Sequence, residues 1–566
     1  MDKFREIVAE RIAFHTKLSN SEVKALLESP KDVSHGDISF PCFNLSKALK
    51  KSPQIIAKEL AESLALKNPI KKMEVVGAYI NFFIDDAEYC KEVFEALKQE
   101  DFGKPKLKKK EKVMIEFCQA NTHKPFHIGH FRNLCLGDAL VRLWKFSGHE
   151  VVAANYPGDV GTHVAKCLWA LKKFHADEQP PEKHRGEWLG LIYAEANSKA
   201  EQSPDYKTEI SAVLKKLEHG EHEMTKLWNE TRQWCLDELN ETYQEMEVDF
   251  DVFFYESEVE KPGKILVQEL LKKGVAKESE GAIIVDLEPY KLDVFVILKT
   301  DGTSLYSTKD IALAKQKFEQ FGIERSIYIV GSEQKFYFKQ LFKTLELMGF
   351  KYAKDCYHLS YELVMLPEGK MSSRSGNVIT FRMVYEEVLA KALEEVKKRR
   401  SDWGDEKERV TARGIALAAL KFSMLNQDNN KTIVFDIEKS LEFEGETGPY
   451  IQYVIARINS ILRKHDGKVP HNPDLSVFKD ESEIKLIKLL GEFPEAVNDA
   501  CYSYRPMRLC KYLIDTSQAF NEFYNKCPVL KAEESEKMAR LALVNSTKKV
   551  LSRGLSLLGI PTLEEM

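Results

Sequence analysis

The sequence lacks any apolar run approaching the 18 or so residues that a membrane-spanning helix requires. Its 566 residues are 43% hydrophobic and 30% charged, which is the balance of an ordinary globular protein. The first segment, MDKFREIVAERIAF, alternates charged and apolar residues and has no apolar core of a signal peptide. We therefore expect a cytoplasmic protein that does not associate with membranes.

Paired cysteines and an excess of positive charge are also missing. None of the ten cysteines forms a C-x-x-C pair, so neither a zinc site nor a redox dithiol of that kind is indicated. The 83 basic residues face 88 acidic ones, for a net charge of -5. Binding to nucleic acid would therefore depend on local basic patches.

The length of the chain exceeds that of a domain with one compact core, so a multidomain chain is expected.

Residues 1–107 predict a small α+β domain. Helix signals at 2–15 and 53–66 precede the strand-like run MEVVGAYINFFI at 73–84. The segment that follows, KQEDFGKPKLKKKEK at 98–112, has the glycine, proline and lysine content of a linker, which either stays solvated or lies against a polyanion.

Residues 108–380 predict an α/β domain with a doubly wound parallel sheet. A strand at 112–120, a helix at 130–148 and a strand at 150–156 would form a right-handed βαβ unit. Residues from about 165 to 285 are helix-rich and charged, and are expected to be an insertion. The alternation resumes with strands expected at 294–300, 326–331 and 356–366.

Residues 381–566 predict an all-α domain. Thr380 can cap the first helix, FRMVYEEVLAKALEEVKKRR. Helical spacing of apolar residues then recurs at 409–425, 446–464, 483–500 and 506–526.

The stretch NTHKPFHIGHF, Asn121 to Phe131, joins the strand expected at 112–120 to the helix expected at 130–148. In a parallel sheet, ligands bind at this place, beyond the carboxyl end of a strand. His127 and His130 would share one side of the first helical turn and could donate hydrogen bonds to phosphate, while Gly129 lets a nucleotide approach the backbone. The helix N-terminus itself favours phosphate. A nucleotide site is the preferred interpretation, and two surface histidines are the alternative.

A second polar loop, GKMSSRSGN at 369–377, follows a strand-like run. Lys370 and Arg374 could neutralise a polyphosphate over which the loop closes, and its serines could add hydrogen bonds. Taken alone, this segment fits a generic polar loop as well as it fits a polyphosphate-binding loop.

Together, the HIGH and KMSSR segments resemble the paired signatures of class I aminoacyl-tRNA synthetases, whose second motif is usually KMSKS. From about residue 35 to the end, the chain is similar to arginyl-tRNA synthetases. The segments that carry this similarity include NYPGDVGTH, LYSTKDIALA, VGSEQKFYFKQLF, FEGETGPYIQYVIARINSILRK, FNEFYNKCPVL and LLGIPTLEEM.

The resemblance implies ATP-dependent ligation of L-arginine to tRNA(Arg) through an arginyl-adenylate, with release of AMP and pyrophosphate. ATP would enter as its Mg²⁺ complex, without a tightly bound cofactor or a protein metal site. Members of the family generally need bound tRNA to form the adenylate, and a monomer is expected.

The resemblance also implies an arginine site. Tyr306, Asp310 and Gln334 match the residues that recognise the side chain, and Glu116 and Asn121 match those that hold the α-amino and carboxylate end. A guanidinium favours such carboxylate and amide acceptors, and Tyr306 and Asp310 share one helical face at i and i+4. The residues alone also allow a half-buried core ring at 306, a surface charge at 310, an outward strand residue at 116 and a helix cap at 334.

For ATP, the resemblance implies catalytic histidines at 127 and 130 and a set of binding residues, namely His127, Gly129, His130, Lys370, Met371, Ser372 and Ser373. Ser373 stands where KMSKS has its second lysine, which is the more important charge for the transition state. Another cation is therefore required, and Lys124 or Arg374 is the candidate.

For tRNA, the resemblance implies contacts of the N-terminal domain with the tRNA elbow through Tyr79 and Asn81, a pair suited to base stacking and base edges. A core strand is the alternative. In the anticodon-binding domain, the family's DALR motif is RPMR here, which keeps Arg508 but loses the acidic residue. Asp159 and His163 lie in a segment that departs from the family, so their roles stay open.

The sequence is also compatible with three other functions, each of which is disfavoured. The acidic and aromatic arginine set disfavours a synthetase for another amino acid, and the intact motifs disfavour a catalytically idle tRNA-binding relative. A small-molecule nucleotidylyltransferase shares the H-x-G-H elbow but has no need for the two flanking domains.

Overall fold

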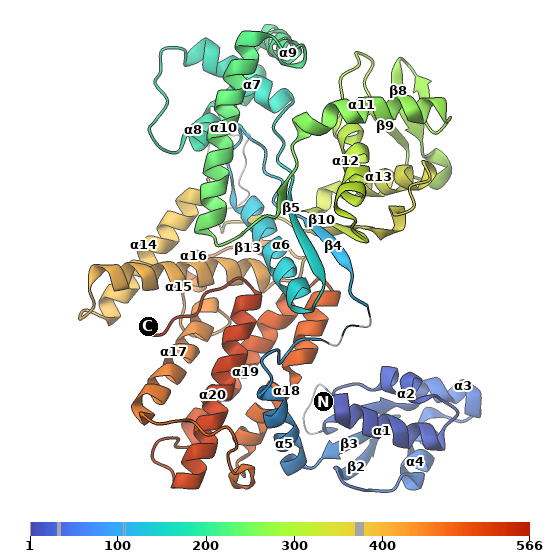
Figure 1. Ribbon diagram of the computed structural model, residues 1–566, viewed down its shortest axis with the longest axis vertical. Coiled ribbons are helices and arrows are strands. Elements are labelled where there is room, and N and C mark those ends of the chain that lie inside the picture. Colours follow the sequence, from blue (N-terminus) through green and yellow to red (C-terminus); the bar gives the residue numbers. More distant parts are fainter. Residues whose placement is uncertain (1, 31–34, 106, 108, 368–378) are drawn as a thin grey trace. The chain divides into compact units, whose positions relative to one another are not determined.

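The computed structural model describes residues 2–30, 35–105, 107, 109–367 and 379–566 (Figure 1). The chain forms two compact units, which are described separately. The first contains Met1–Gly103, Ile461–Glu495 and Asp515–Val550, and the second contains Lys104–Ser460, Ala496–Ile514 and Leu551–Met566.

The first unit is built on a three-stranded antiparallel sheet in the order β1-β3-β2, formed by β1 (Ile38–Pro41), β3 (Tyr79–Ile84) and β2 (Ile70–Val76). The expected single strand at 73–84 is therefore a hairpin, because Gly77, with φ +61°, turns the chain between β2 and β3. The helices of this part are α1 (Asp2–His15), α2 (Asn20–Leu26), α3 (Ser46–Leu49), α4 (Pro53–Ser63) and α5 (Asp86–Leu97).

The C-terminal third is helical, as expected, and among its described residues the two-residue strand β13 (Ile433–Val434) is the exception. Thr380 caps its first helix by accepting a hydrogen bond from the backbone N–H of Met383. Segments of the later helices contribute to both compact units. The helices are α14 (Phe381–Arg399), α15 (Asp405–Leu425), α16 (Ile437–Ser440), α17 (Gly448–His465), α18 (Glu481–Tyr502), α19 (Met507–Lys526) and α20 (Glu534–Leu557).

The second unit contains the predicted parallel sheet. Its order is β11-β10-β4-β5-β6, and every neighbouring pair is parallel. The helix α6 (Ile128–Phe146) connects β4 to β5. Since the chain moves outward from β4 in one direction and later returns to β10 on the other side, the topological switch point lies between β4 and β10. The strands are β4 (Lys112–Glu116), β5 (Glu150–Asn155), β6 (Val252–Phe253), β10 (Arg325–Gly331) and β11 (Cys356–Tyr361).

The insertion in the structure differs from the predicted one in its bounds and in its secondary structure. Four helices separate β5 from β6, namely α7 (Thr162–Phe174), α8 (Arg185–Ala200), α9 (Pro204–Glu218) and α10 (His222–Glu245). After β6, the chain builds a second small element from α11 (Glu256–Lys272), α12 (Tyr306–Phe321) and an antiparallel sheet, whose strands are β7 (Lys277–Ser279), β8 (Ala282–Asp286) and β9 (Val294–Leu298).

Two strand predictions are corrected here. The run at 294–300 belongs to the antiparallel sheet rather than to the parallel one, and its alternation of exposed and buried residues suits a sheet covered on one face. The run at 356–366 is divided, because β11 ends at Tyr361 and the following β12 (Val364–Met365) pairs with β13 (Ile433–Val434). The helix α13 (Lys335–Leu347) lies between β10 and β11.

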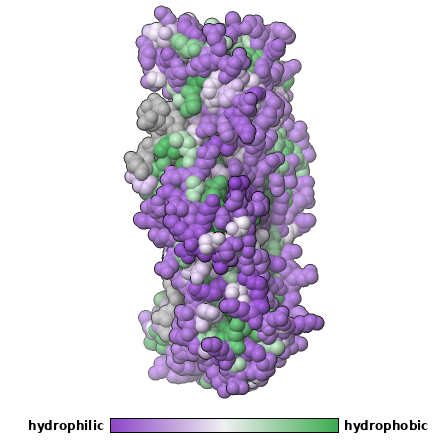
Figure 2. Space-filling view, turned by 90° about the vertical axis from the view of Figure 1, so that its left-hand side faces the viewer, coloured by the Kyte–Doolittle hydropathy of each residue, from purple (hydrophilic) through white to green (hydrophobic). Residues whose placement is uncertain are grey.

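In the described part of the chain, no helix is long and apolar enough to cross a membrane. On the face drawn in Figure 2, hydrophilic residues predominate and apolar ones form small separate patches.

Candidate active site

The HIGH segment forms a closed cap at the start of α6. His127 is the N-cap residue, and its Nδ1 accepts a hydrogen bond from the backbone N–H of Gly129 at 3.1 Å. In return, Nδ1 of His130 accepts one from the N–H of His127 at 3.3 Å. The two rings stack with centroids 3.8 Å apart. The histidine cap thus already uses the N–H of Gly129, so this amide of the helix N-terminus is not free for a phosphate.

This cap fixes which nitrogen of each ring carries the proton. Because both Nδ1 atoms accept hydrogen bonds, each neutral imidazole holds its hydrogen on Nε2. Burial, aided by the charge of Lys124, lowers the pKa of His127 to about 4 and that of His130 well below its usual range. Both rings are therefore neutral near pH 7 and present an Nε2–H donor, which suits a phosphate oxygen.

A cavity of about 330 Å³ lies at the switch point, where the loops after β4 and β10 diverge. The residues that line it include all five predicted arginine-site residues and Lys124. The lining consists of Glu116, Gln119, Asn121, Lys124, Tyr156, Gly158, Glu256, Tyr306, Asp310, Leu313, Tyr328, Val330, Gln334, Tyr337 and Phe338.

Two of the three carboxylates that line the cavity each form an ion pair with a lysine. Glu116, at the end of β4, is 3% exposed and forms an ion pair with Lys317 of α12. Glu256, at the start of α11, accepts a hydrogen bond from Lys309 of α12, with Oε2 and Nζ 2.6 Å apart. The alternative that Glu116 points outward from its strand is therefore wrong.

We expect Lys317→Met to lower the free energy of unfolding by about 3 to 5 kcal/mol, because it would leave the Glu116 carboxylate buried without a cation. Lys315→Met is the matched control, since Lys315 lies on the same helix but has 44% of its side chain exposed and forms a pair with Glu319 at the surface. Urea unfolding of both variants measures the difference. Similar midpoints for the two would show that the buried pair contributes little.

Asp310 is the third carboxylate. Its Oδ2 accepts a hydrogen bond from the hydroxyl of Tyr337 on α13, and among the described residues no lysine, arginine or histidine lies within ion-pair distance of it. Burial raises the pKa of Asp310, the hydrogen bond from Tyr337 and the charge of Lys317 lower it, and the neighbouring Glu116 and Glu256 raise it, which together bring it to about 7. The cavity therefore contains one carboxylate that lacks a positive partner.

The other predicted arginine residues lie around this carboxylate. Tyr306 begins α12 and is 56% exposed, so it is not a core ring. Gln334 occupies the N-cap position of α13, but its side chain makes no capping hydrogen bond, which excludes the capping alternative. Asn121 is held against the loop after β5, where a Cβ on Gly158 would lie 2.1 Å from its Oδ1.

Several functional candidates were missed from the sequence, above all Lys309, Lys317 and Tyr337. The two lysines are three and eleven residues after Tyr306, and this spacing places them on the face of α12 that carries Asp310. That spacing was the available signal. The sequence contains no comparable signal for Tyr337, because its contact with Asp310 joins two different helices.

Asp159 and His163 have structural contacts. Asp159 is fully buried, pairs with Arg232 of α10 at 2.8 Å and accepts hydrogen bonds from the backbone N–H and the hydroxyl of Ser257. A ring nitrogen of His163, Nε2, lies 3.2 Å from the carbonyl oxygen of Gly158. These contacts hold the loop after β5 against the start of α11.

The second motif lies outside the described residues, and with it the predicted residues Lys370, Met371, Ser372, Ser373 and Arg374. The chain beyond it is bound to the HIGH segment, since the N–H of Phe381 donates to the carbonyl of Phe126 at 2.8 Å. The ring of Phe126 in turn stacks on His130.

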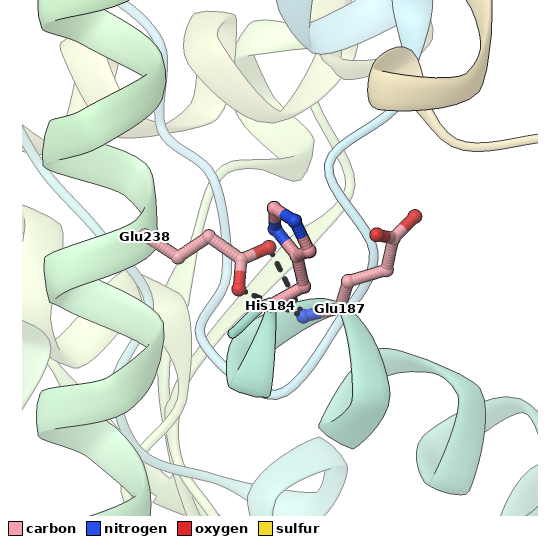
Figure 3. A group of neighbouring side chains, drawn as sticks. All are labelled: His184, Glu187 and Glu238. Atoms are coloured by element: carbon pink, nitrogen blue, oxygen red, sulfur yellow. Dashed lines mark hydrogen bonds between the residues drawn. The ribbon is translucent and has the colours of Figure 1, made fainter. Parts of the chain in front are cut away.

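His184, Glu187 and Glu238 form a group that could offer ligands to a metal ion (Figure 3). However, the Glu238 carboxylate reaches from α10 to the start of α8 and accepts hydrogen bonds from the backbone N–H groups of Gly186 and Glu187. This capping contact accounts for the position of Glu238 without a metal ion.

The predicted tRNA residues differ in exposure. Tyr79 is half-buried, whereas Asn81 is 3% exposed and its Oδ1 accepts a hydrogen bond from Ser39 at 2.6 Å. Arg508 is exposed, and its Nε lies 3.5 Å from Oδ2 of Asp499. Asp499 thus supplies an acidic neighbour that the RPMR segment itself lacks.

Three family models match this chain. "tRNA synthetases class I (R), catalytic domain" matches residues 92–437, "DALR anticodon binding domain" matches 451–566, and "Arginyl tRNA synthetase N terminal domain" matches 2–84. The chain belongs to the arginyl-tRNA synthetase family. This confirms the predicted family, its class I ligase type and the fold class.

Full-length relatives agree with the family models. The arginine–tRNA ligase of Bdellovibrio bacteriovorus is 41% identical over 556 residues, which cover 96% of this chain and 94% of the relative. That of Clostridium botulinum is 36% identical over the full length of both chains. The arginyl-tRNA synthetase of Thermus thermophilus has a TM-score of 0.83 at 30% identity, over 99% of this chain and 100% of the relative. The enzyme from Plasmodium falciparum, at 19% identity and a TM-score of 0.81 over 100% of this chain and 98% of its own, shares the fold.

Proposed function

We propose that the cavity between the ends of β4 and β10 binds arginine, and that the HIGH segment and the 370–374 loop hold ATP beside it. The reaction is the ATP-dependent ligation of L-arginine to tRNA(Arg). Arginine's carboxylate oxygen attacks the α-phosphorus of ATP, the bond to the β-phosphate oxygen breaks, and pyrophosphate leaves. The 2′-hydroxyl at the tRNA 3′ end then attacks the acyl carbon of the adenylate, and AMP leaves.

The unpaired Asp310 is the observation that supports arginine most strongly. Lys317 and Lys309 already compensate Glu116 and Glu256, so the cavity has one carboxylate free for a cation. A guanidinium is always charged, is planar, and binds carboxylates with two parallel hydrogen bonds. Tyr306 and Gln334 can complete this end of the site with a ring face and an amide oxygen.

The same cavity also contains residues that suit the reacting groups. Asn121 and Lys124 line it, and Lys124 also lies close enough to His127 and His130 to contribute to the low pKa of both. We assign the amide of Asn121, with Glu116, to the amino-acid end of arginine. Lys124 and the two Nε2–H groups bind phosphate oxygens and stabilise the charge that develops on them.

No side chain acts as a nucleophile in this scheme. The protein contributes by positioning two substrates and by supplying cations to the phosphates, as in other phosphoryl-transfer reactions. Mg²⁺ enters with ATP as part of the substrate. Gly129, Lys370, Met371, Ser372 and Ser373 complete the ATP site, and Arg374 adds charge to it.

Binding of tRNA(Arg) is divided among the predicted domains, 1–107, 108–380 and 381–566. We assign the elbow contact to Tyr79 in the first, where the buried Asn81 holds β3 against β1 through Ser39, and a phosphate contact to Arg508 in the third. The enzyme acts as a monomer in the cytoplasm.

Arginine binding should depend on pH through Asp310. Burial raises the pKa of Asp310 to about 7 in the free protein, with smaller contributions from Tyr337 on α13, Glu116 on β4, Glu256 on α11 and Lys317 on α12, and a bound guanidinium lowers that pKa because it favours the ionised carboxylate. Affinity should therefore be constant above pH 7 and fall about tenfold for each pH unit below it. Calorimetric titration with arginine between pH 5.5 and 8.5 measures this. A flat profile for the wild type would contradict the assignment, and Asp310→Asn should give a flat one.

A further inference from the structure

Arg132 of α6 is a buried cation that has no carboxylate partner in the described part of the chain. Its side chain is 1% exposed, and burial lowers the pKa of the guanidinium to about 10. The carboxylate of Glu362 pairs with Lys335 instead, and that of Asp428 pairs with Arg505. Because burying a charge without a counter-ion is costly, the contacts that this guanidinium does make indicate its role.

The guanidinium of Arg132 binds backbone carbonyl groups of two separate segments. Its Nη1 donates to the carbonyl oxygen of Glu362 at 2.5 Å and to that of Lys431 at 3.0 Å, and its Nη2 donates to that of Asp428 at 3.2 Å. Glu362 lies just before β12, and the other two lie just before β13, with which β12 pairs. A planar group with several N–H donors in fixed directions can hold both segments at once.

The first of these segments leads into the second motif. The strand β12 ends at Met365, five residues before Lys370. On the other side of the motif, the ring of Phe381 stacks on that of Phe131 of α6, with centroids 4.4 Å apart. Two consecutive residues of α6, Phe131 and Arg132, therefore contact the chain before and after the second motif.

We propose that Arg132 is a positioning residue for adenylate formation, which holds the strand before the second motif in register with the histidine cap of α6. His127 and His130 begin the same helix, so a contact between this helix and β12 sets one half of the ATP site against the other. Groups that act on the same phosphates must be placed closely, since a shift of about 1 Å can cost about 10²-fold in rate. The inference rests on the proposed ATP site.

The decisive variant is Arg132→Met, tested by ATP–pyrophosphate exchange with arginine and tRNA(Arg). It should lower kcat about 10²-fold and raise the KM for ATP about tenfold, because the two halves of the ATP site lose their common support. The KM for arginine should stay within a factor of about two, since Glu362, Asp428 and Lys431 are not among the residues that line the arginine cavity.

Arg132→Lys keeps the charge but replaces the planar group by a single ammonium, so it should recover part of the rate and remain about tenfold below the wild type. This variant decides the question if Arg132→Met does not fold. A wild-type kcat and KM for ATP in Arg132→Lys would then overturn the inference, as would equal rises of the KM values for ATP and arginine in either variant.

Lys421→Met is the matched control, because it removes another buried cation that α6 contacts. Lys421 of α15 is 1% exposed, donates to the carbonyl oxygen of Gly559 at 2.7 Å and lies 3.8 Å from Asp138 of α6, which keeps its pair with Arg142. The control should lower the urea midpoint and leave the KM for ATP unchanged. If it gave the same kinetic profile as Arg132→Met, Arg132 would contribute stability alone and the inference would be overturned. Failure of the wild type to exchange with arginine would refute the proposed function instead.

Discussion

Asp310→Asn is expected to raise the KM for arginine by about 10² to 10³-fold and to leave the KM for ATP within a factor of about two. The substitution keeps the size of the side chain and removes the charge that the guanidinium requires. Truncating one partner of a buried charged pair costs about 2 to 5 kcal/mol, and every 1.4 kcal/mol is a factor of ten. Steady-state kinetics at saturating tRNA give both constants.

The control for this variant is Asp293→Asn, which removes an exposed carboxylate that precedes β9. It should leave both constants unchanged. If Asp310→Asn raised the two KM values equally, Asp310 would support the fold of the site rather than bind arginine.

Lys124→Ala is expected to slow adenylate formation by about 10² to 10³-fold, the typical effect of removing one preorganised group that stabilises transition-state charge. Lys124 is half-buried in the cavity wall, lies over the ring of Tyr193 and is near both histidines of the HIGH segment. It is thus placed to supply the cation that is missing at Ser373. Single-turnover measurement of the adenylate, with tRNA present, isolates this step.

Arg374→Ala is the comparison for Lys124→Ala, because both residues could replace the missing lysine. Lys124→Arg should retain part of the rate, since it keeps a charge at the site. A wild-type rate for Lys124→Ala, together with a slow Arg374→Ala, would assign the role to Arg374.

The elbow of the site was predictable because its determinants are local. The strand at 112–116, the cap at His127 and the helix from Ile128 follow one another within a short segment, and their apolar pattern and spacing are readable in the sequence. The orientation of the two imidazole rings could not be predicted from the sequence. It depends on Nδ1 contacts within the cap, which a sequence alone does not distinguish from free side chains.

Long-range contacts account for most of what the sequence left open. The strand at 294–298 has a pattern compatible with either sheet, and only its pairing with β8 decides between them. The ion pairs of Glu116 with Lys317 and of Glu256 with Lys309 join residues 201 and 53 positions apart. Among the described lining residues, the unpaired carboxylate of Asp310, to which we assign the cavity's selectivity for a cation, becomes visible only once these partners are known.

The central claim is that Asp310 makes this cavity specific for arginine. ATP–pyrophosphate exchange, measured with tRNA(Arg) over all twenty amino acids, tests it most directly. We expect exchange with arginine, and loss of that exchange in Asp310→Asn at arginine concentrations that saturate the wild type. Exchange driven by lysine or a neutral amino acid at a comparable rate, or an Asp310→Asn enzyme that still saturates with arginine as the wild type does, would contradict it.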